Sequence, residues 1–228
     1  MNSFILNSIN KNPVPQPSNV ISNVNKAPIF GNGAATWTSA TNNAPVNNGY
    51  TLKKQNSEDD SFITVTLLFT FYLSGSQTTI YPSSNFYITF GTGSTNWSSL
   101  SVTNPPYPKI MFGSADRSWQ RVWDINNINY YRYRIEGSSG TGGTPGSPTM
   151  VCEVSVVKLN YYGDNKQYIE LLCGNLSQTN GPFLIANQNT NLLTNSLALA
   201  TNKSYVFEGN SSGTSWTVYT GSLSNPPY

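Results

Sequence analysis

Two glutamates, Glu153 and Glu170, lie in neighbouring apolar runs that the sequence predicts to be the two strands of one hairpin. Retaining glycosidases place two carboxylates about 5 Å apart in an aromatic cleft, where one acts as nucleophile and the other as acid. The Tyr and Trp content of the chain suits such a cleft. No local motif accompanies the pair, so we favour solvent-facing glutamates on amphipathic strands and assign no catalytic residue.

A second candidate is the segment 109–136, in which five basic and three acidic residues leave a net charge of +2 beside several aromatic residues. Arginine next to Trp or Tyr can stack on bases or hold phosphates. The same residue types are enriched in interfaces between proteins, which is the interpretation that we favour. The interface candidates are Arg117, Trp119, Arg121, Trp123, Arg132 and Arg134.

The tryptophans could also serve as platforms on which sugars stack, as in a lectin. They are Trp37, Trp97, Trp119, Trp123 and Trp216. A tryptophan in a β protein lies more often in the core or an interface, so a carbohydrate- or receptor-binding head remains the alternative function.

The chain lacks the residues that several kinds of catalytic or metal-binding site require. The chain has no histidine, the side chain most used for acid–base catalysis near neutral pH and the commonest metal ligand. It has no phosphate-binding glycine loop and no cluster of metal ligands in sequence. Cys152 and Cys173 lie in apolar runs, and we interpret them as buried reduced thiols, with a disulfide left open. We expect no enzymatic activity, no small-molecule substrate, no metal and no cofactor.

Composition predicts a polar but mostly neutral surface. Of the 228 residues only 10% are charged, whereas 37% are hydrophobic and 13% aromatic. Such a surface suits contact with other protein copies or with sugars, because little charge must be desolvated. The net charge of +2 makes nucleic acid an unlikely partner.

Residues 1–58 form a predicted extended arm that is rich in Pro and Asn. Alternating prolines favour an extended path without ladder hydrogen bonds. The candidate assembly residues of the arm are Phe4, Ile5, Leu6, Pro13, Pro15, Pro17, Ile29 and Phe30. The N-terminus lacks the basic and apolar regions of a secretory signal, and no stretch has the length of a membrane span. We therefore expect synthesis without a signal peptide and no transmembrane segment.

Residues 59–228 are predicted to form an antiparallel β-sandwich. From Ser61 to Leu73 the residues alternate with a period of two, with one wholly apolar face. Further strands are expected at 86–90, 109–112, 129–136, 150–161, 167–173, 205–208 and 215–219. The segment 192–199 fits a short helix or a strand. Residues 114–123 are expected to form one or two helical turns, with Trp119, Val122 and Trp123 on one side.

The arm, the long Phe- and Thr-rich strand, the Gly/Ser loop at 137–147 and the Asn-rich neutral composition resemble viral single jelly-roll capsid proteins. The resemblance is to the penton and minor capsid components of large DNA viruses, and it covers most of the chain without a diagnostic motif. It implies a jelly roll, a location in the virion, a homo-oligomer (pentamer or trimer) and contacts with other capsid proteins. The same features also resemble the head domains of viral fibres, which are trimers with receptor-binding loops.

Overall fold

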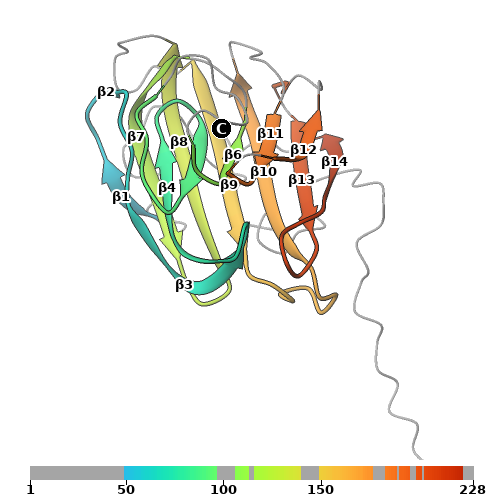
Figure 1. Cartoon of the computed structure of the whole chain (residues 1–228). Helices are drawn as coiled ribbons and strands as arrows, with labels where there is room; N and C mark the ends of the chain where they lie inside the picture. The colour runs from blue at the N-terminus through green and yellow to red at the C-terminus, as the bar shows by residue number, and fades with distance from the viewer. Residues whose placement is uncertain are drawn as a thin grey trace, which may run out of the picture.

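Two antiparallel β-sheets face each other and form a sandwich in the computed structural model (Figure 1). The structure describes residues 49–96, 106–112, 116–139, 149–176, 183–188, 190–195, 199–201 and 203–222. Within these ranges, no helix is long and apolar enough to cross a membrane. The antiparallel β-sandwich predicted from the sequence is confirmed. The eight arm candidates, Phe4 to Phe30, lie outside the described residues.

Sheet A contains eight strands in the order β1-β7-β8-β9-β10-β13-β14, with β2 also paired to β7. Their bounds are β1 (Thr51–Lys54), β2 (Glu58–Asp59), β7 (Arg117–Asn126), β8 (Tyr130–Ser139), β9 (Met150–Val157), β10 (Gln167–Leu176), β13 (Lys203–Gly209) and β14 (Trp216–Ser222). Strands β7 to β10 follow one another in the chain and lie side by side. This half of the sandwich is therefore a meander and not one of the Greek keys that make up a jelly roll.

Sheet B contains six strands in the order β12-β11-β6-β5-β4-β3. Their bounds are β3 (Val65–Tyr72), β4 (Ser76–Ser83), β5 (Tyr87–Phe90), β6 (Lys109–Met111), β11 (Phe183–Ala186) and β12 (Asn191–Asn195). The segment 192–199, which fitted a helix or a strand, thus contributes strand β12.

The alternation predicted from Ser61 to Leu73 appears in β3, where buried and more exposed residues follow one another. Its buried side chains enter the main core between the sheets. Phe71 illustrates the packing, because its ring lies 5.7 Å from that of Phe90 in sheet B and 6.0 Å from that of Trp216 in sheet A. The apolar face of one strand therefore joins the two sheets.

A side-chain amide and a glycine fix the contact between β3 and sheet A. The Gln167 side chain accepts a hydrogen bond from the Tyr72 N–H (2.9 Å) and donates one to the Tyr72 carbonyl. Gly213, in the turn after β13, has a φ of +69°, and a Cβ there would lie 1.8 Å from the Tyr72 carbonyl oxygen. Only glycine fits this turn, because any side chain would collide with the backbone of β3.

The predicted helical turns at 114–123 are wrong, because the described part of this segment belongs to strand β7. A β-bulge interrupts the pairing of β7 with β8 between Trp119 and Arg121. A bulge adds one residue to one strand, so Trp119 and Val122 both enter the core although they are three positions apart. That spacing is the one a helix produces, which explains the wrong prediction.

The N-terminal boundary of the sandwich also differs from the expected position at residue 59. Strand β1 pairs with β7 near Trp123, and β2 pairs with β7 near Trp119. Thr51–Lys54 and Glu58–Asp59 therefore belong to sheet A, although their polar sequence resembles that of the preceding arm.

Adjacent leucines in β3 provide a direct test of this sandwich. Leu67 is 4% exposed and Leu68 is 57% exposed. Leu67→Ala should lower the free energy of unfolding by about 2–5 kcal/mol, because it leaves a cavity in the core. Leu68→Ala should change it by about 1 kcal/mol or less. Chemical denaturation of both variants checks the prediction, and equal losses would contradict the assigned faces of β3.

Candidate functional site

One face of sheet A packs on sheet B, and its opposite face carries charged side chains. Cross-strand pairing places them side by side: Arg121 lies opposite Glu136, and Arg134 lies opposite Glu153. We call this surface the charged face. It consists of Arg121, Trp123, Arg132, Arg134, Glu136, Glu153 and Glu170, with Tyr50 from the segment before β1. All eight residues are buried.

A carboxylate between two guanidinium groups forms one end of the charged face. Glu136 accepts hydrogen bonds from Arg121 Nε (2.7 Å) and from Arg134 Nη2 (2.7 Å). The guanidinium carbons of Arg121 and Arg134 lie 4.9 Å and 5.7 Å from the centre of the Trp123 ring. Salt bridges and cation–π contacts thus share the same arginines and offset part of the cost of burying them.

Glu153 forms the centre of the charged face. It accepts a hydrogen bond from the Tyr50 hydroxyl, and Arg132 Nη1 lies 3.9 Å from its Oε2 atom. Burial raises the pKa of Glu153, against the opposing effects of Arg132, Tyr50 and Arg134. Burial, followed by the charge of Glu153, raises the pKa of Tyr50 well above its usual value. Tyr50 is therefore a hydrogen-bond donor, and it links the segment before β1 to Glu153 of strand β9.

Glu170 lies opposite Ser155, two positions along β9 from Glu153. Its Oε1 atom accepts a hydrogen bond of 2.7 Å from the Tyr162 hydroxyl. Burial raises the pKa of Glu170 to about 7, although Tyr162 and Arg132 act in the opposite direction. The charge of Glu170 therefore changes near neutral pH.

The expected solvent-facing position of the two glutamates is wrong. Glu153 and Glu170 share one face of the hairpin β9–β10, as diagonal neighbours, but their exposed fractions are 0% and 1%. A glycosidase needs its acid and its nucleophile within reach of a sugar and of water. Here the carboxylates meet tyrosine and arginine side chains, so the arrangement stabilises a buried network and offers no open catalytic cleft.

The six interface candidates are all buried within the chain, and they divide between the two faces of sheet A. Arg121, Trp123, Arg132 and Arg134 belong to the charged face. Arg117 points the other way, where its Nη1 atom lies 3.0 Å from Met150 Sδ and its guanidinium carbon 5.8 Å from the Phe86 ring. Trp119 enters the same core. These residues therefore hold this chain together and do not form an exposed patch.

The tryptophans and cysteines among the described residues are also buried. Trp119, Trp123 and Trp216 offer no exposed sugar platform, and Trp37 and Trp97 lie outside the described residues. Cys152 and Cys173 face each other across β9 and β10 as buried free thiols. Burial raises the pKa of Cys173 well above its usual value, so it is held as a neutral thiol.

Two adjacent carboxylates, Asp59 and Asp60, meet a third from a distant part of the sequence, Asp116, at the end of β2. One oxygen from each of Asp59, Asp60 and Asp116 lies within 4.8 Å of the others. Burial and the charges of Asp60 and Asp116 raise the pKa of Asp59. Asp60 accepts a hydrogen bond of 2.8 Å from the Asn85 side chain. The three residues are partly exposed, water can solvate them, and we assign no metal to this cluster.

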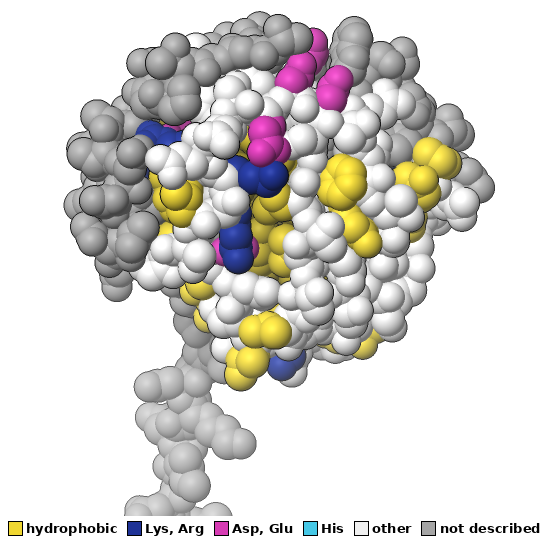
Figure 2. All heavy atoms as spheres, turned by 90° about the vertical axis from the view of Figure 1, so that its left-hand side faces the viewer, with side chains coloured by type: hydrophobic (Ala, Val, Ile, Leu, Met, Phe, Trp, Pro, Cys, Tyr) yellow, Lys and Arg dark blue, Asp and Glu magenta, His cyan; other side chains and the backbone are white. Residues whose placement is uncertain are grey.

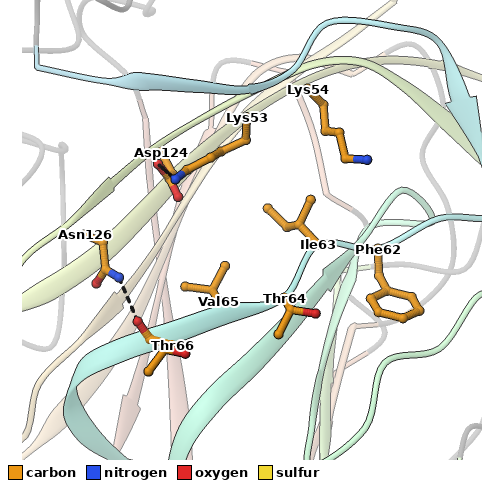
Figure 3. Close-up of a pocket in the computed structure, with 9 residues that line it drawn as sticks. All are labelled: Lys53, Lys54, Phe62, Ile63, Thr64, Val65, Thr66, Asp124 and Asn126. Carbon is orange, nitrogen blue, oxygen red and sulfur yellow. Dashed lines mark hydrogen bonds and ion pairs between the residues drawn. The ribbon is translucent and has the colours of Figure 1, made fainter.

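A groove opens at the edge of the sandwich between β1 of sheet A and the start of β3 in sheet B, with a volume of about 400 Å³ (Figure 3). Ile63 and Val65 point into it from below, and the side chains of Lys53 and Lys54 border it above. Asn126 closes one end, because its side-chain amide donates a hydrogen bond of 2.8 Å to the Thr66 carbonyl. We call this hollow the edge groove.

Three large hydrophobic side chains of the described residues are exposed. They are Phe62 (36% exposed), Leu68 (57%) and Ile128 (64%). Phe62 lines the edge groove, Leu68 belongs to β3, and Ile128 follows Asn126 in the turn that reaches β3. The sequence did not single out this edge, because its apolar residues come from separate strands and are mixed with polar ones.

Removing one carboxylate from the charged face should be costly. Glu136→Gln removes the carboxylate that pairs with two buried guanidinium groups, so we expect a loss of about 3–5 kcal/mol in the free energy of unfolding. Glu58→Gln is the matched control, because its partner Lys54 is 32% exposed and surface pairs contribute about 1 kcal/mol or less. Urea denaturation compares the two variants. Similar small losses in the free energy of unfolding would show that the contacts of Glu136 with Arg121 and Arg134 do not stabilise the sheet.

Glu170 should make stability depend on pH. Its pKa is raised from the usual 4.5 to about 7 in the folded chain. The contribution of its neutral form is therefore complete below pH 4.5 and is lost as the pH rises through 7. Glu170→Gln, which cannot ionise, should flatten the melting temperature between pH 4.5 and 8 and be the more stable protein at pH 8.

The size of this effect is a few kcal/mol, at about 1.4 kcal/mol per pKa unit. Thermal melts of the parent and the variant across this pH range measure it. Glu208→Gln is the control, because Glu208 is bonded to Lys166 (2.9 Å) near the surface of the same sheet. Parallel pH profiles for the parent and Glu170→Gln would refute the assignment of the titration to Glu170.

No protein-family model matches this chain, and comparison with curated proteins and with solved structures finds no significant similarity. We therefore infer its function from the chemistry and geometry of the described residues.

Proposed function

We propose that this chain is a non-enzymatic structural subunit that associates with copies of itself, of the kind that builds a virion shell. The observation that carries the proposal is the separation of charged from exposed apolar side chains. The charged face is buried within the chain, whereas the exposed large hydrophobic residues are Phe62 just before β3, Leu68 in β3 and Ile128 in the turn between β7 and β8.

Burial of the charged face leaves a surface with even less charge than the composition implies. Figure 2 faces the left-hand edge of Figure 1, where β1 to β3 lie, and shows few basic and acidic side chains among mostly uncharged atoms. Two such surfaces can associate without desolvating many charges, and that cost is a main obstacle to contact between proteins. The neutral composition and the buried arginines therefore support the same role.

The alternative, a carbohydrate- or receptor-binding head, would need accessible aromatic platforms. The tryptophans of the described residues are buried, so we prefer the assembly role. A glycosidase has the weakest support of the three functions, because Glu153 and Glu170 are buried and inaccessible to a sugar. As part of the same proposal, the chain forms a homo-oligomer, contacts other capsid proteins and is located in the virion.

The association of the full chain tests the assembly role. Light scattering coupled to size exclusion should show an oligomer of defined size. Leu68→Glu combined with Ile128→Glu should weaken association at least about tenfold, a change of about 1.4 kcal/mol, because charge would be buried at the contact. Thr217→Glu on the exposed side of β14 is the control and should leave association unchanged. A parent chain that remains monomeric at every concentration would refute the proposal.

A further inference from the structure

The edge groove lies between two strands that each lack a neighbour on one side. In the described part of the chain, β1 ends sheet A and β3 ends sheet B. The free edge of a strand presents unpaired N–H and C=O groups, to which an extended segment can add. The groove thus offers backbone partners at its walls and apolar side chains, Ile63 and Val65, at its floor (Figure 3).

The walls of the edge groove carry no unbalanced charge. Lys53 Nζ lies 3.4 Å from Asp124 Oδ1, and Lys54 Nζ lies 2.9 Å from Glu58 Oε2. The volume of about 400 Å³ would hold roughly a dozen waters at about 30 Å³ each. Releasing water from the apolar floor formed by Ile63 and Val65 favours an occupant with apolar side chains.

We propose that the edge groove binds the segment Phe4–Ile5–Leu6 of a neighbouring copy of this chain. This segment is the only run of three large apolar residues in the first 48 residues, and residues 1–10 contain no charged side chain. A neutral apolar strand therefore meets a groove whose charges are already paired.

The spacing of the side chains also fits. In an extended strand, Phe4 and Leu6 point to the same side and stand about 6.6 Å apart along the strand. Ile63 and Val65 have the same spacing of two residues, and both point into the edge groove (Figure 3). Two apolar side chains of the arm can therefore contact two of the floor while the backbone runs along a free strand edge.

The length of the arm permits contact between copies. Residues 7–49 separate Leu6 from Tyr50, which is held on the charged face by Glu153. An extended chain of this length spans up to roughly 150 Å, several times the radius of gyration of about 16 Å expected for a body of this size. The inference rests on the proposed assembly role, which makes another copy the partner in place of the chain's own groove.

Disulfide trapping tests the contact in the full-length chain. One copy carries Leu6→Cys, a second copy with a different tag carries Ile63→Cys, and the mixture is treated with oxidised glutathione. We expect a covalent dimer that contains both tags, with a yield at least about fivefold above that of the control mixture of Ile21→Cys and Ile63→Cys. The native Cys152 and Cys173 are buried and should not react.

The outcomes separate the two proposals. A chain that oligomerises but yields no more dimer from Leu6→Cys than from Ile21→Cys overturns the groove contact and leaves the assembly role standing. If a single chain with both Leu6→Cys and Ile63→Cys closes within itself and the mixture gives no dimer, the groove binds its own arm and the contact between copies is overturned. A monomeric parent chain overturns the assembly role and the groove contact together.

Discussion

The central strands of sheet A are buried on both faces, and this double burial governs where the chain places its charge. One face joins the apolar core, and the other holds three arginines and three glutamates, with salt bridges at Glu136 and Glu153. Ions removed from water are tolerated only when they are paired and hydrogen-bonded. Glu136 therefore bridges Arg121 and Arg134, and Tyr50 reaches Glu153 across 103 positions of the chain.

The same constraint shapes the surface. A chain with few charged residues that also buries many of them presents mostly neutral polar groups, so its exposed apolar side chains are not separated by strong charge. These side chains lie near β3, which together with β1 forms an end of a sheet among the described residues. An edge with both apolar side chains and unpaired backbone groups is the part of a β-sandwich most suited to association.

Much of the fold could be predicted from alternation alone. The predicted strand around Phe69 and the hairpin that carries Glu153 and Glu170 are both present. The helical turns predicted at 114–123 were wrong for a local reason. A bulge beside Trp119 in β7 breaks the period of two and produces the spacing of a helix. Little of the candidate site could be predicted, because its charged members have the composition of an exposed amphipathic face.

The sequence by itself determined that the chain is a β-sandwich with a neutral surface, since period-two patterns and low charge are local and compositional properties. Only the tertiary structure decided which residues are accessible. Alternation places Ile169 and Glu170 on opposite faces of a strand, but it cannot say whether the second face meets water or other side chains. That depends on contacts between distant segments, such as Tyr162 on Glu170 and Tyr50 on Glu153.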